Sequence, residues 1–283
     1  MRLLVTGYRG QLGRAVVEAA AADGLEVTGV DLPELDITDA AALRRAVTAA
    51  RPEVIVNCAA FTAVDAAEAQ EAEATRVNGT AVATLATVAD ELGALLVQIS
   101  TDYVFDGSAS RPYREEDPPN PASAYGRSKL AGEEAARRAR RHLVARTAWL
   151  FGHGGRNFVE AIRAQITAGA PLLRVVNDQV GSPTYATDLA HALLRLAAAG
   201  ASGVVHVVNQ GAASWFEFAL EIVAQLGAKT IVVPIATAES GRPAQRPANS
   251  VLDTQRLRRL LGAPLPPWQD ALARYLERER GRA

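Results

Sequence analysis

The stretch LLVTGYRGQLG, residues 3–13, decides the fold. A short apolar run opens it, and Gly7, Gly10 and Gly13 then follow with the spacing G-x-x-G-x-x-G before an alanine-rich helical pattern that continues to Ala22. Glycines permit a tight turn and a close approach of the backbone to a phosphate, and a helix N-terminus offers free N–H groups to an anion. The stretch therefore predicts a strand, a loop and a helix that bind a dinucleotide. The alternative for the glycine spacing alone is a structural turn.

The rest of the chain alternates short apolar runs with longer helical patterns. Continuous apolar strands separated by helices are typical of a parallel sheet that is covered on both faces. We therefore predict an α/β protein with a Rossmann-type doubly wound parallel sheet and a smaller C-terminal substrate lobe. The further strands are expected at residues 25–30, 54–57, 95–100, 143–147 and 204–208, and further helices at about 39–50, 75–92 and 124–140.

Glycine and proline become frequent after residue 150, and the alternation of strands and helices loosens there. We expect residues 1–150 to form a dinucleotide-binding domain, to which about 185–210 return. Residues 151–184 and 211–283 are expected to form mainly a substrate-binding lobe.

Two local patterns carry more detailed expectations. Asp253 has the side chain of a helix cap and is expected to begin a short helix that ends at Leu261. The charge run from Glu133 to Arg141 is expected to be the solvated face of a helix.

The composition is nearly neutral. The 283 residues include 30 basic and 31 acidic side chains, a net charge of −1, so nothing electrostatic favours nucleic acid or an anionic membrane surface as a partner. No apolar run approaches the roughly 20 residues of a membrane helix, and no signal peptide is recognisable, so we expect a cytoplasmic protein.

The only cysteine, Cys58, excludes an internal disulfide and is interpreted as a small buried side chain rather than a reactive thiol. The four histidines are scattered singly, and no metal site is predicted.

Two side chains near the loop bear on the choice of cofactor. Asp31 ends the second strand, where a carboxylate accepts hydrogen bonds from ribose hydroxyls and disfavours a 2′-phosphate. Arg9, inside the glycine loop, is placed to attract such a phosphate instead. The sequence therefore leaves NADH and NADPH open.

Tyr125 and Lys129 stand four residues apart in the segment YGRSK, which follows the fourth strand. On a helix the two side chains share a face. A neighbouring ammonium favours phenolate, so we expect the pKa of Tyr125 to fall from about 10 toward neutrality, and the phenol to donate a proton to a carbonyl oxygen as hydride reaches the carbon. Lys129 is also expected to hold the nicotinamide ribose.

Thr101 lies at the carboxyl end of the fourth strand, the edge at which open α/β sheets bind ligands. Its hydroxyl can orient the substrate oxygen, although an ordinary Ser/Thr turn would be equally polar. Thr101, Tyr125 and Lys129 together predict an NAD(P)-dependent oxidoreductase that acts on a carbonyl/alcohol pair.

These motifs resemble the extended short-chain dehydrogenase/reductase superfamily and, within it, the dTDP-4-dehydrorhamnose reductase family. The matching segments follow the family's order over nearly the whole chain, and they are residues 57–65, 100–107, 125–132, 146–149, 177–184 and 246–250. The glycine loop alone is not specific, but the combination is.

The resemblance implies that NADPH or NADH reduces the C4 ketone of dTDP-4-dehydro-L-rhamnose. It makes Tyr125 the proton donor, Lys129 its partner and Thr101 the third member of the set. The residues implied to line the cofactor, besides Tyr125 and Lys129, are Gly7, Gly10, Gln11, Leu12, Gly13, Asp31, Asp36, Ile37, Ala59, Ala60, Phe61, Thr62, Ile99 and Ser100. Those implied to contact the nucleotide sugar are Val64, Thr101, Asp102, Tyr103, Trp149, Asn157, Gln179, Pro183, Thr184 and Arg246. A tryptophan that follows a strand, such as Trp149, also suits a core position.

The chain departs from the family at two points. Some members place an acidic residue just after the last loop glycine and use it in a Mg²⁺-bridged dimer, whereas Arg14 and Ala15 stand here, so no metal is expected and a monomer or homodimer stays open. Phe61 stands where a polar aromatic residue or histidine is frequent. Two alternatives share these motifs: a reductase for another dTDP-4-keto-deoxysugar of secondary metabolism, and a non-catalytic regulatory subunit of the same fold.

Overall fold

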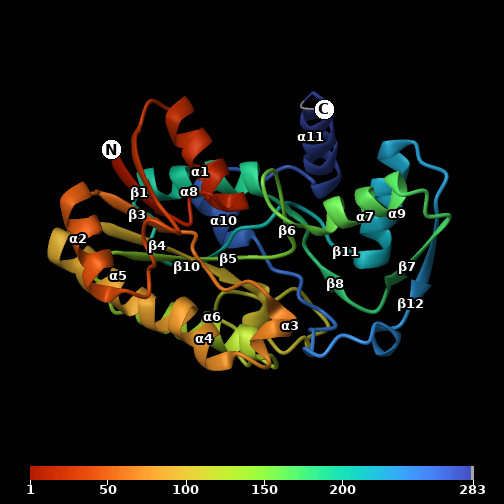
Figure 1. Cartoon of the computed structure of the whole chain (residues 1–283), viewed down its shortest axis with the longest axis horizontal. Helices are drawn as coiled ribbons and strands as arrows, with labels where there is room; N and C mark the ends of the chain where they lie inside the picture. The colour runs from red at the N-terminus through yellow and green to blue at the C-terminus, as the bar shows by residue number, and fades with distance from the viewer. Residues whose placement is uncertain (282–283) are drawn as a thin grey trace.

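The computed structural model describes residues 1–281, which form two lobes side by side (Figure 1). The larger lobe is built on a six-stranded sheet whose strands are all parallel, in the spatial order β2-β1-β3-β4-β5-β10. The prediction of a Rossmann-type doubly wound parallel sheet is confirmed. The strands are β1 (Arg2–Thr6), β2 (Glu26–Val30), β3 (Val54–Asn57), β4 (Leu95–Thr101), β5 (His142–Thr147) and β10 (Gly203–His206).

Helices cover both faces of the sheet because its strands are apolar on both sides. Leu3 and Val5 of β1 pack with the helices of one face, and Leu4 packs with those of the other. The first face carries α1 (Gln11–Ala22), α8 (Ala186–Ala198) and α10 (Gln255–Leu261). The second carries α2 (Ala40–Ala50), α5 (Ala81–Leu92) and α6 (Ala124–Ala136).

The chain reverses its winding at β1. From β1 it crosses to β2 on one side, and it then returns to place β3 on the other side of β1. Ligands of open α/β sheets bind at such a switch point, outside the carboxyl ends of the strands. The glycine loop, Gly7 to Gly13, leaves β1 at this point.

The second lobe has a hydrophobic core of its own, which contains Phe151, Phe218, Trp268 and Tyr275. In Figure 1 it lies at the right of the sheet. Its elements are β6 (Leu150–Phe151), α7 (Phe158–Thr167), β7 (Leu172–Val176), β8 (Val180–Gly181), β9 (Thr184–Tyr185), β11 (Ala213–Ser214), α9 (Trp215–Leu226), β12 (Ile231–Ile235), η3 (Thr237–Glu239) and α11 (Trp268–Arg280).

The separate hydrophobic cores of the two lobes suggest where the chain divides. We propose that residues 1–150 and 185–210 form the dinucleotide-binding domain and that the other residues form the substrate-binding lobe, with one change. Leu257 of α10 packs in the same core as Leu193 of α8 and Val205 of β10, so this helix belongs with the sheet although it lies within residues 211–283.

Helix ends differ from the expected ones in three places. The helix expected at residues 124–140 is α6, which ends at Ala136. The helix expected at residues 75–92 is α4 (Glu71–Thr75), a π-helical turn η1 (Arg76–Thr80) and then α5. The residue before α10 is Thr254, and Asp253 accepts a hydrogen bond from the backbone N–H of Gln255 at 2.7 Å. None of the helices within residues 1–281 is both long enough and apolar enough to span a membrane.

The expectation that Glu133 to Arg141 form a solvated face is wrong for Glu133. This residue is completely buried and forms a bidentate ion pair with buried Arg146 of β5, in which both N···O distances are 2.8 Å. Glu133 also accepts a hydrogen bond from Ser100 at 2.6 Å. A periodicity of charges along a helix does not reveal that one of them faces an arginine on a buried strand.

Glu133→Ala is expected to lower the free energy of unfolding by about 3–5 kcal/mol, because it leaves the charge of Arg146 buried without its partner. Urea unfolding measures this loss. The matched control is Glu134→Ala, which removes the neighbouring exposed carboxylate of the same helix and is expected to change stability by less than about 0.5 kcal/mol. Equal effects of the two substitutions would contradict a stabilising pair.

Candidate active site

The glycine loop is tightly packed at the carboxyl end of β1. Gly7 has a φ of 62°, in the left-handed region, and a Cβ at Gly13 would lie 2.1 Å from the carbonyl oxygen of Gly7. Gly10 is the N-cap of α1, and no side chain caps this end of the helix. The first N–H groups of α1 are therefore left to an anion, which fits a dinucleotide phosphate.

Asp31 is anchored at the end of β2. Its carboxylate accepts hydrogen bonds from the backbone N–H groups of Arg9 and Leu32, both at 2.9 Å. The guanidinium of Arg9 donates to the carbonyl of Leu32 and to Glu34, both at 2.6 Å. Asp31 thus presents a fixed carboxylate, and Glu34 competes with a 2′-phosphate for Arg9.

The residues that follow β3 form the next wall of the site. The amide of buried Asn78 holds the backbone of Phe61, because it accepts from the Phe61 N–H at 2.9 Å and donates to the Phe61 carbonyl at 3.0 Å. The same amide donates to the Ser128 hydroxyl of α6 at 2.9 Å. One side chain in the π-helical turn therefore ties the expected cofactor wall to the helix that carries Tyr125 and Lys129.

The structure brings Thr101, Tyr125 and Lys129 together. Thr101 ends β4, and its side chain lies close enough to the Tyr125 phenol to lower the pKa of that group. Lys129 is 3% exposed, and its ammonium donates to the carbonyl of Ile99 at 2.7 Å. The ring of Tyr103 meets the Tyr125 ring edge-on, with 5.8 Å between centroids.

The expectation that the pKa of Tyr125 falls toward neutrality is wrong for this arrangement. Burial raises its pKa above the ordinary value, the charge of Asp102 raises it further, and only the contact with Thr101 lowers it. Burial also lowers the pKa of Lys129 to about 8. Sequence spacing places the two groups on one face of α6, but it does not show how completely water is removed from them.

Cys58 lies close to Lys129. Burial raises the pKa of its thiol to about 12, which agrees with the interpretation of a small packed side chain rather than a reactive thiol.

Asp102 is a buried carboxylate beside this group. It accepts a hydrogen bond from the Thr101 hydroxyl at 3.0 Å, and the Ser250 side chain lies against it and lowers its pKa. Burial raises the pKa of Asp102 to about 6. A buried carboxylate at the end of β4 can also accept a hydrogen bond from a ligand.

Trp149 stands at the start of the second lobe in an unusual conformation. Its φ of 46° is rare for a residue with a large side chain. The indole stacks on that of Trp215 with centroids 3.5 Å apart, and a Cβ at Gly181 would lie 2.4 Å from its ring. A strained backbone held by packing on both sides is typical of a functional site, which favours the substrate role over a simple core role.

Arg246 is held by an ion pair across the two lobes. Its guanidinium donates to Asp65 of α3 (Val64–Ala67) at 2.9 Å, and the backbone N–H of Ala244 donates to the same carboxylate at 3.2 Å. The positive charges of Arg246 and Arg242 act on the Tyr103 phenol, which places both arginines near the candidate site.

Other expected ligand residues have polar groups that are already engaged. Asn157 caps α7 and donates to the Gln11 side chain at 3.1 Å, so it lies beside the glycine loop. Gln179 is buried and donates to Thr237 at 2.9 Å. Asp36 is exposed and accepts from Thr38. Of the remaining expected residues, Leu12, Ile37, Ile99, Ser100, Pro183 and Thr184 are buried, Val64, Ala59 and Ala60 are half-buried, and Thr62 is exposed.

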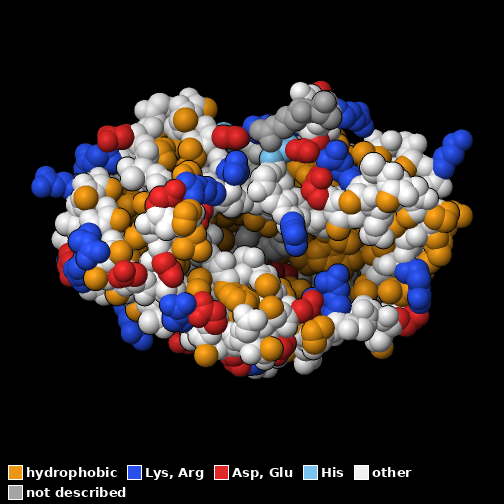
Figure 2. All heavy atoms as spheres, in the orientation of Figure 1, with side chains coloured by type: hydrophobic (Ala, Val, Ile, Leu, Met, Phe, Trp, Pro, Cys, Tyr) orange, Lys and Arg blue, Asp and Glu red, His pale blue; other side chains and the backbone are white. Residues whose placement is uncertain are grey.

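Figure 2 shows a deep hollow between the two lobes, and its wall on the side of the second lobe is largely apolar.

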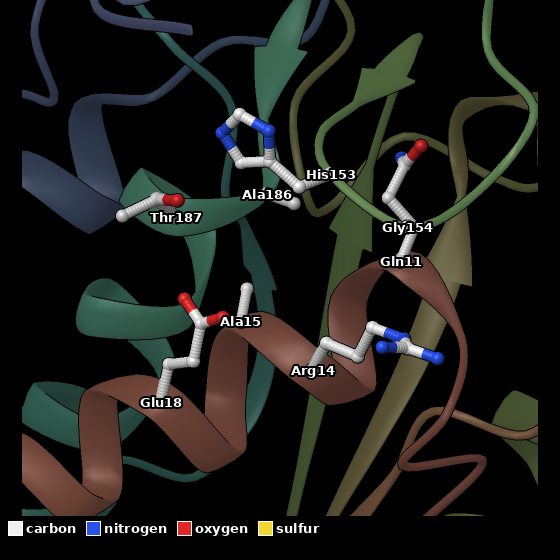
Figure 3. A pocket seen from close by; sticks show the side chains of 8 residues that line it. All are labelled: Gln11, Arg14, Ala15, Glu18, His153, Gly154, Ala186 and Thr187. Atoms are coloured by element: carbon white, nitrogen blue, oxygen red, sulfur yellow. The ribbon is translucent and has the colours of Figure 1, made fainter. Parts of the chain in front are cut away.

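A smaller cavity of about 70 Å³ lies elsewhere, between α1, α8 and the loop after β6 (Figure 3). Arg14 and Glu18 project from α1 there, and His153 lies above the start of α8. No catalytic candidate lines it. Among residues 1–281, no three His, Cys, Asp or Glu side chains are grouped to hold a metal ion.

Four residues of this site were not predicted. Asn78, Gln98 and Glu133 are buried polar groups that hold the active face together, and Trp215 supports Trp149. The available signal for Gln98 was a polar residue in the middle of an otherwise apolar strand, LLVQIST. Trp215 had no such signal, because its role depends on how the second lobe folds back.

Comparisons with known proteins place the whole chain in one family. The family model described as "RmlD substrate binding domain" matches residues 1–280. A dTDP-4-dehydrorhamnose reductase of Streptomyces griseus is 43% identical over 290 residues, covering 100% of this chain and 95% of the relative. A "probable dTDP-4,6-dihydroxy-2-methyloxan-3-one 4-ketoreductase" of Streptomyces antibioticus is 43% identical, covering 96% and 93%. Among solved structures, a dTDP-4-dehydrorhamnose reductase of Bacillus anthracis in complex with NADP superposes on this chain with a TM-score of 0.94. Its sequence is 36% identical to this one, and the match covers 98% of this chain and 99% of that one.

The raised pKa of Asp102 predicts a stability change that depends on pH. The unfolded chain ionises this carboxyl near its ordinary pKa of about 3.9, whereas the folded chain ionises it at about 6, so the carboxylate destabilises the fold increasingly as pH rises from about 4 to 6. Relative to wild type, Asp102→Asn is therefore expected to be more stable at pH 7 than at pH 4, by up to about 3 kcal/mol. Denaturant unfolding at both pH values measures the difference. Asp23→Asn, at an exposed carboxylate, serves as the control, and a pH-independent effect of Asp102→Asn would contradict the prediction.

Proposed function

We propose that this chain, which belongs to the dTDP-4-dehydrorhamnose reductase family, reduces the C4 ketone of dTDP-4-dehydro-L-rhamnose. The product is dTDP-L-rhamnose, and the reductant is NADPH or NADH. The observation that carries the proposal is the meeting of Thr101, Tyr125 and Lys129 at the carboxyl end of β4, next to the switch point of the sheet.

The shape of the glycine loop supports a bound dinucleotide. The uncapped N-terminus of α1 suits a pyrophosphate, and a side chain at Gly13 would occupy space that the loop itself fills. The bound cofactor supplies hydride to the C4 carbon. In this proposal Asp31 would accept hydrogen bonds from the adenosine ribose, and Lys129 would hold the nicotinamide ribose.

The protein's own residues handle the proton. The Tyr125 phenol donates to the C4 oxygen and gives up its proton as negative charge develops there. The Thr101 hydroxyl donates to Asp102 in this structure, so it joins the phenol as a donor only after turning from Asp102 to the C4 oxygen. The buried ammonium of Lys129 is not among the groups that lower the pKa of the phenol, and it donates to the Ile99 carbonyl, so its role in this proposal is to hold the nicotinamide ribose. Burial excludes water from the group, so each of these interactions is stronger than in solution.

A sister activity has a specific observation in its favour. The Streptomyces antibioticus relative and the dTDP-4-dehydrorhamnose reductase of Streptomyces griseus are each 43% identical to this chain, and the former is named for a different dTDP-4-keto sugar. The residues proposed for catalysis do not separate the two substrates, because both reactions reduce a C4 ketone. We also propose that the protein acts in the cytoplasm, as a monomer or a homodimer.

The experiment that tests the function is a panel of dTDP-4-keto sugars assayed with NADPH and with NADH. Oxidation of the cofactor is followed by its absorbance, and dTDP-4-dehydro-L-rhamnose is expected to be reduced with the highest kcat/KM. Much faster reduction of another keto sugar would support the sister activity instead. No turnover with any of them would point to a regulatory subunit.

Tyr125→Phe is expected to lower kcat roughly a hundredfold or more, because the reaction loses its proton donor while the ring and its packing stay in place. The matched control is Tyr113→Phe, which removes a phenol that hydrogen-bonds Asp106 and lies outside the proposed site. The control is expected to keep most of the activity. A Tyr125→Phe protein as active as wild type would remove this residue from the mechanism.

A further inference from the structure

We infer that Gln98 is a positioning residue for Lys129, and that it acts through the carbonyl oxygen of Ile99 at the end of a buried row of polar side chains. The inference rests on the proposed function, since Lys129 is the group that the row serves.

The row crosses three neighbouring strands at one level. Thr6 of β1 is in register with Asn57 of β3, and Asn57 is in register with Gln98 of β4. All three side chains are at most 1% exposed. The Thr6 hydroxyl donates to Asn57 Oδ1 at 2.5 Å, and Asn57 Nδ2 donates to Gln98 Oε1 at 2.7 Å.

The hydrogen bonds of the row all run in one direction. The backbone N–H of Ala59 donates to the Thr6 oxygen at 3.3 Å, which leaves the Thr6 proton for Asn57. Asn57 must then turn its NH₂ toward Gln98, and Gln98 must turn its own NH₂ away, where it donates to the carbonyl of Ile99 at 2.9 Å. A chain of aligned bonds in a dry interior polarises and stiffens its members.

The Ile99 carbonyl is where this row meets the active site. The register between β3 and β4 stops at Asn57 and Gln98, one residue before Ile99. The Ile99 oxygen takes two side-chain donors, the Gln98 amide at 2.9 Å and the Lys129 ammonium at 2.7 Å. A carbonyl oxygen has two lone pairs, so Gln98 occupies one and fixes the direction of the other.

The core gives no packing reason for polar residues at these positions. Val56 and Val97 precede Asn57 and Gln98, and both are as deeply buried. Polar groups at such positions cost free energy unless every hydrogen bond is made, whereas valine or leucine would pack without that condition. A fixed acceptor for Lys129 accounts for a polar row that the sheet itself does not need.

The charges around Lys129 are few. Glu133 on the next turn of α6 favours the ammonium, and the Cys58 thiol lies on the side of β3. Glu133 is itself paired with Arg146. Burial is the largest influence and lowers the pKa of Lys129 to about 8, so the ammonium depends on well-placed acceptors.

The sequence supplies a direct probe, because Lys129 and Lys229 are its only lysines. Protein labelled with ¹³C at the lysine ε-carbon gives two signals, which Lys229→Arg assigns. Exposed Lys229 then serves as the internal reference. In Gln98→Met the Lys129 signal is expected to titrate about one pH unit lower than in wild type, because the ammonium loses much of a charge-assisted hydrogen bond. The high-pH limb of kcat is expected to move with it.

The matched control is Val144→Ala, at the buried position of β5 that faces Gln98 in the register. It loosens the same part of the core without touching a hydrogen bond of the row, so the Lys129 titration is expected to stay at the wild-type pH. If Gln98→Met and Val144→Ala lower the melting temperature alike and neither moves the titration, the row is structural only and the inference is wrong.

A second pair covers the case in which Gln98→Met does not fold. Thr6→Val removes the hydroxyl and keeps the shape, whereas Thr6→Ser keeps the hydroxyl. The valine variant is expected to lower the Lys129 titration by a smaller amount, and the serine variant is expected to leave it in place; identical titrations would overturn the inference. The readout needs no substrate, so it stands even if the keto-sugar panel shows no turnover.

Discussion

The close contact between α6 and the end of β4 is the constraint on which the active face depends. A Cβ at Gly126 would lie 2.2 Å from the carbonyl oxygen of Tyr103, so only glycine lets the helix approach the strand end this closely. That approach brings Tyr125 to Thr101, and it brings Lys129, one turn further, to the Ile99 carbonyl. The chemistry therefore depends on a backbone distance as much as on the catalytic side chains.

The same approach removes water from several ionisable groups. Lys129, Asp102 and the Glu133–Arg146 pair are all buried near the end of β4, and behind them His206 has its pKa lowered to about 3 by burial and by the charge of Arg146. Each of these groups needs a partner inside the protein. Ser100 donates to Glu133, the Ile99 carbonyl takes the Lys129 ammonium, and Asp102 accepts from Thr101 and contacts Ser250.

The sequence predicts what depends on local order and misses what depends on distant contacts. Strands, the glycine loop and the pair Tyr125 and Lys129 follow from apolar runs and from spacing along one helix, and the sheet confirms the fold drawn from them. The burial of Glu133 was missed because its partner lies on β5, and the rise in the Tyr125 pKa was missed because spacing carries no information on solvent. Trp215 and Asp65 act through the second lobe, whose irregular loops leave no periodic pattern to interpret.

This division explains why the reaction can be inferred further than the sugar. The residues proposed for proton transfer lie on the end of β4 and on α6, whose positions are fixed by the sheet and by one close backbone contact. Trp149, in a left-handed conformation, and Arg246, tied to Asp65 across the lobes, depend instead on the second lobe. Small changes in either contact would leave the sheet untouched. The residues expected to contact the sugar therefore belong to the part of the molecule that the sequence describes least.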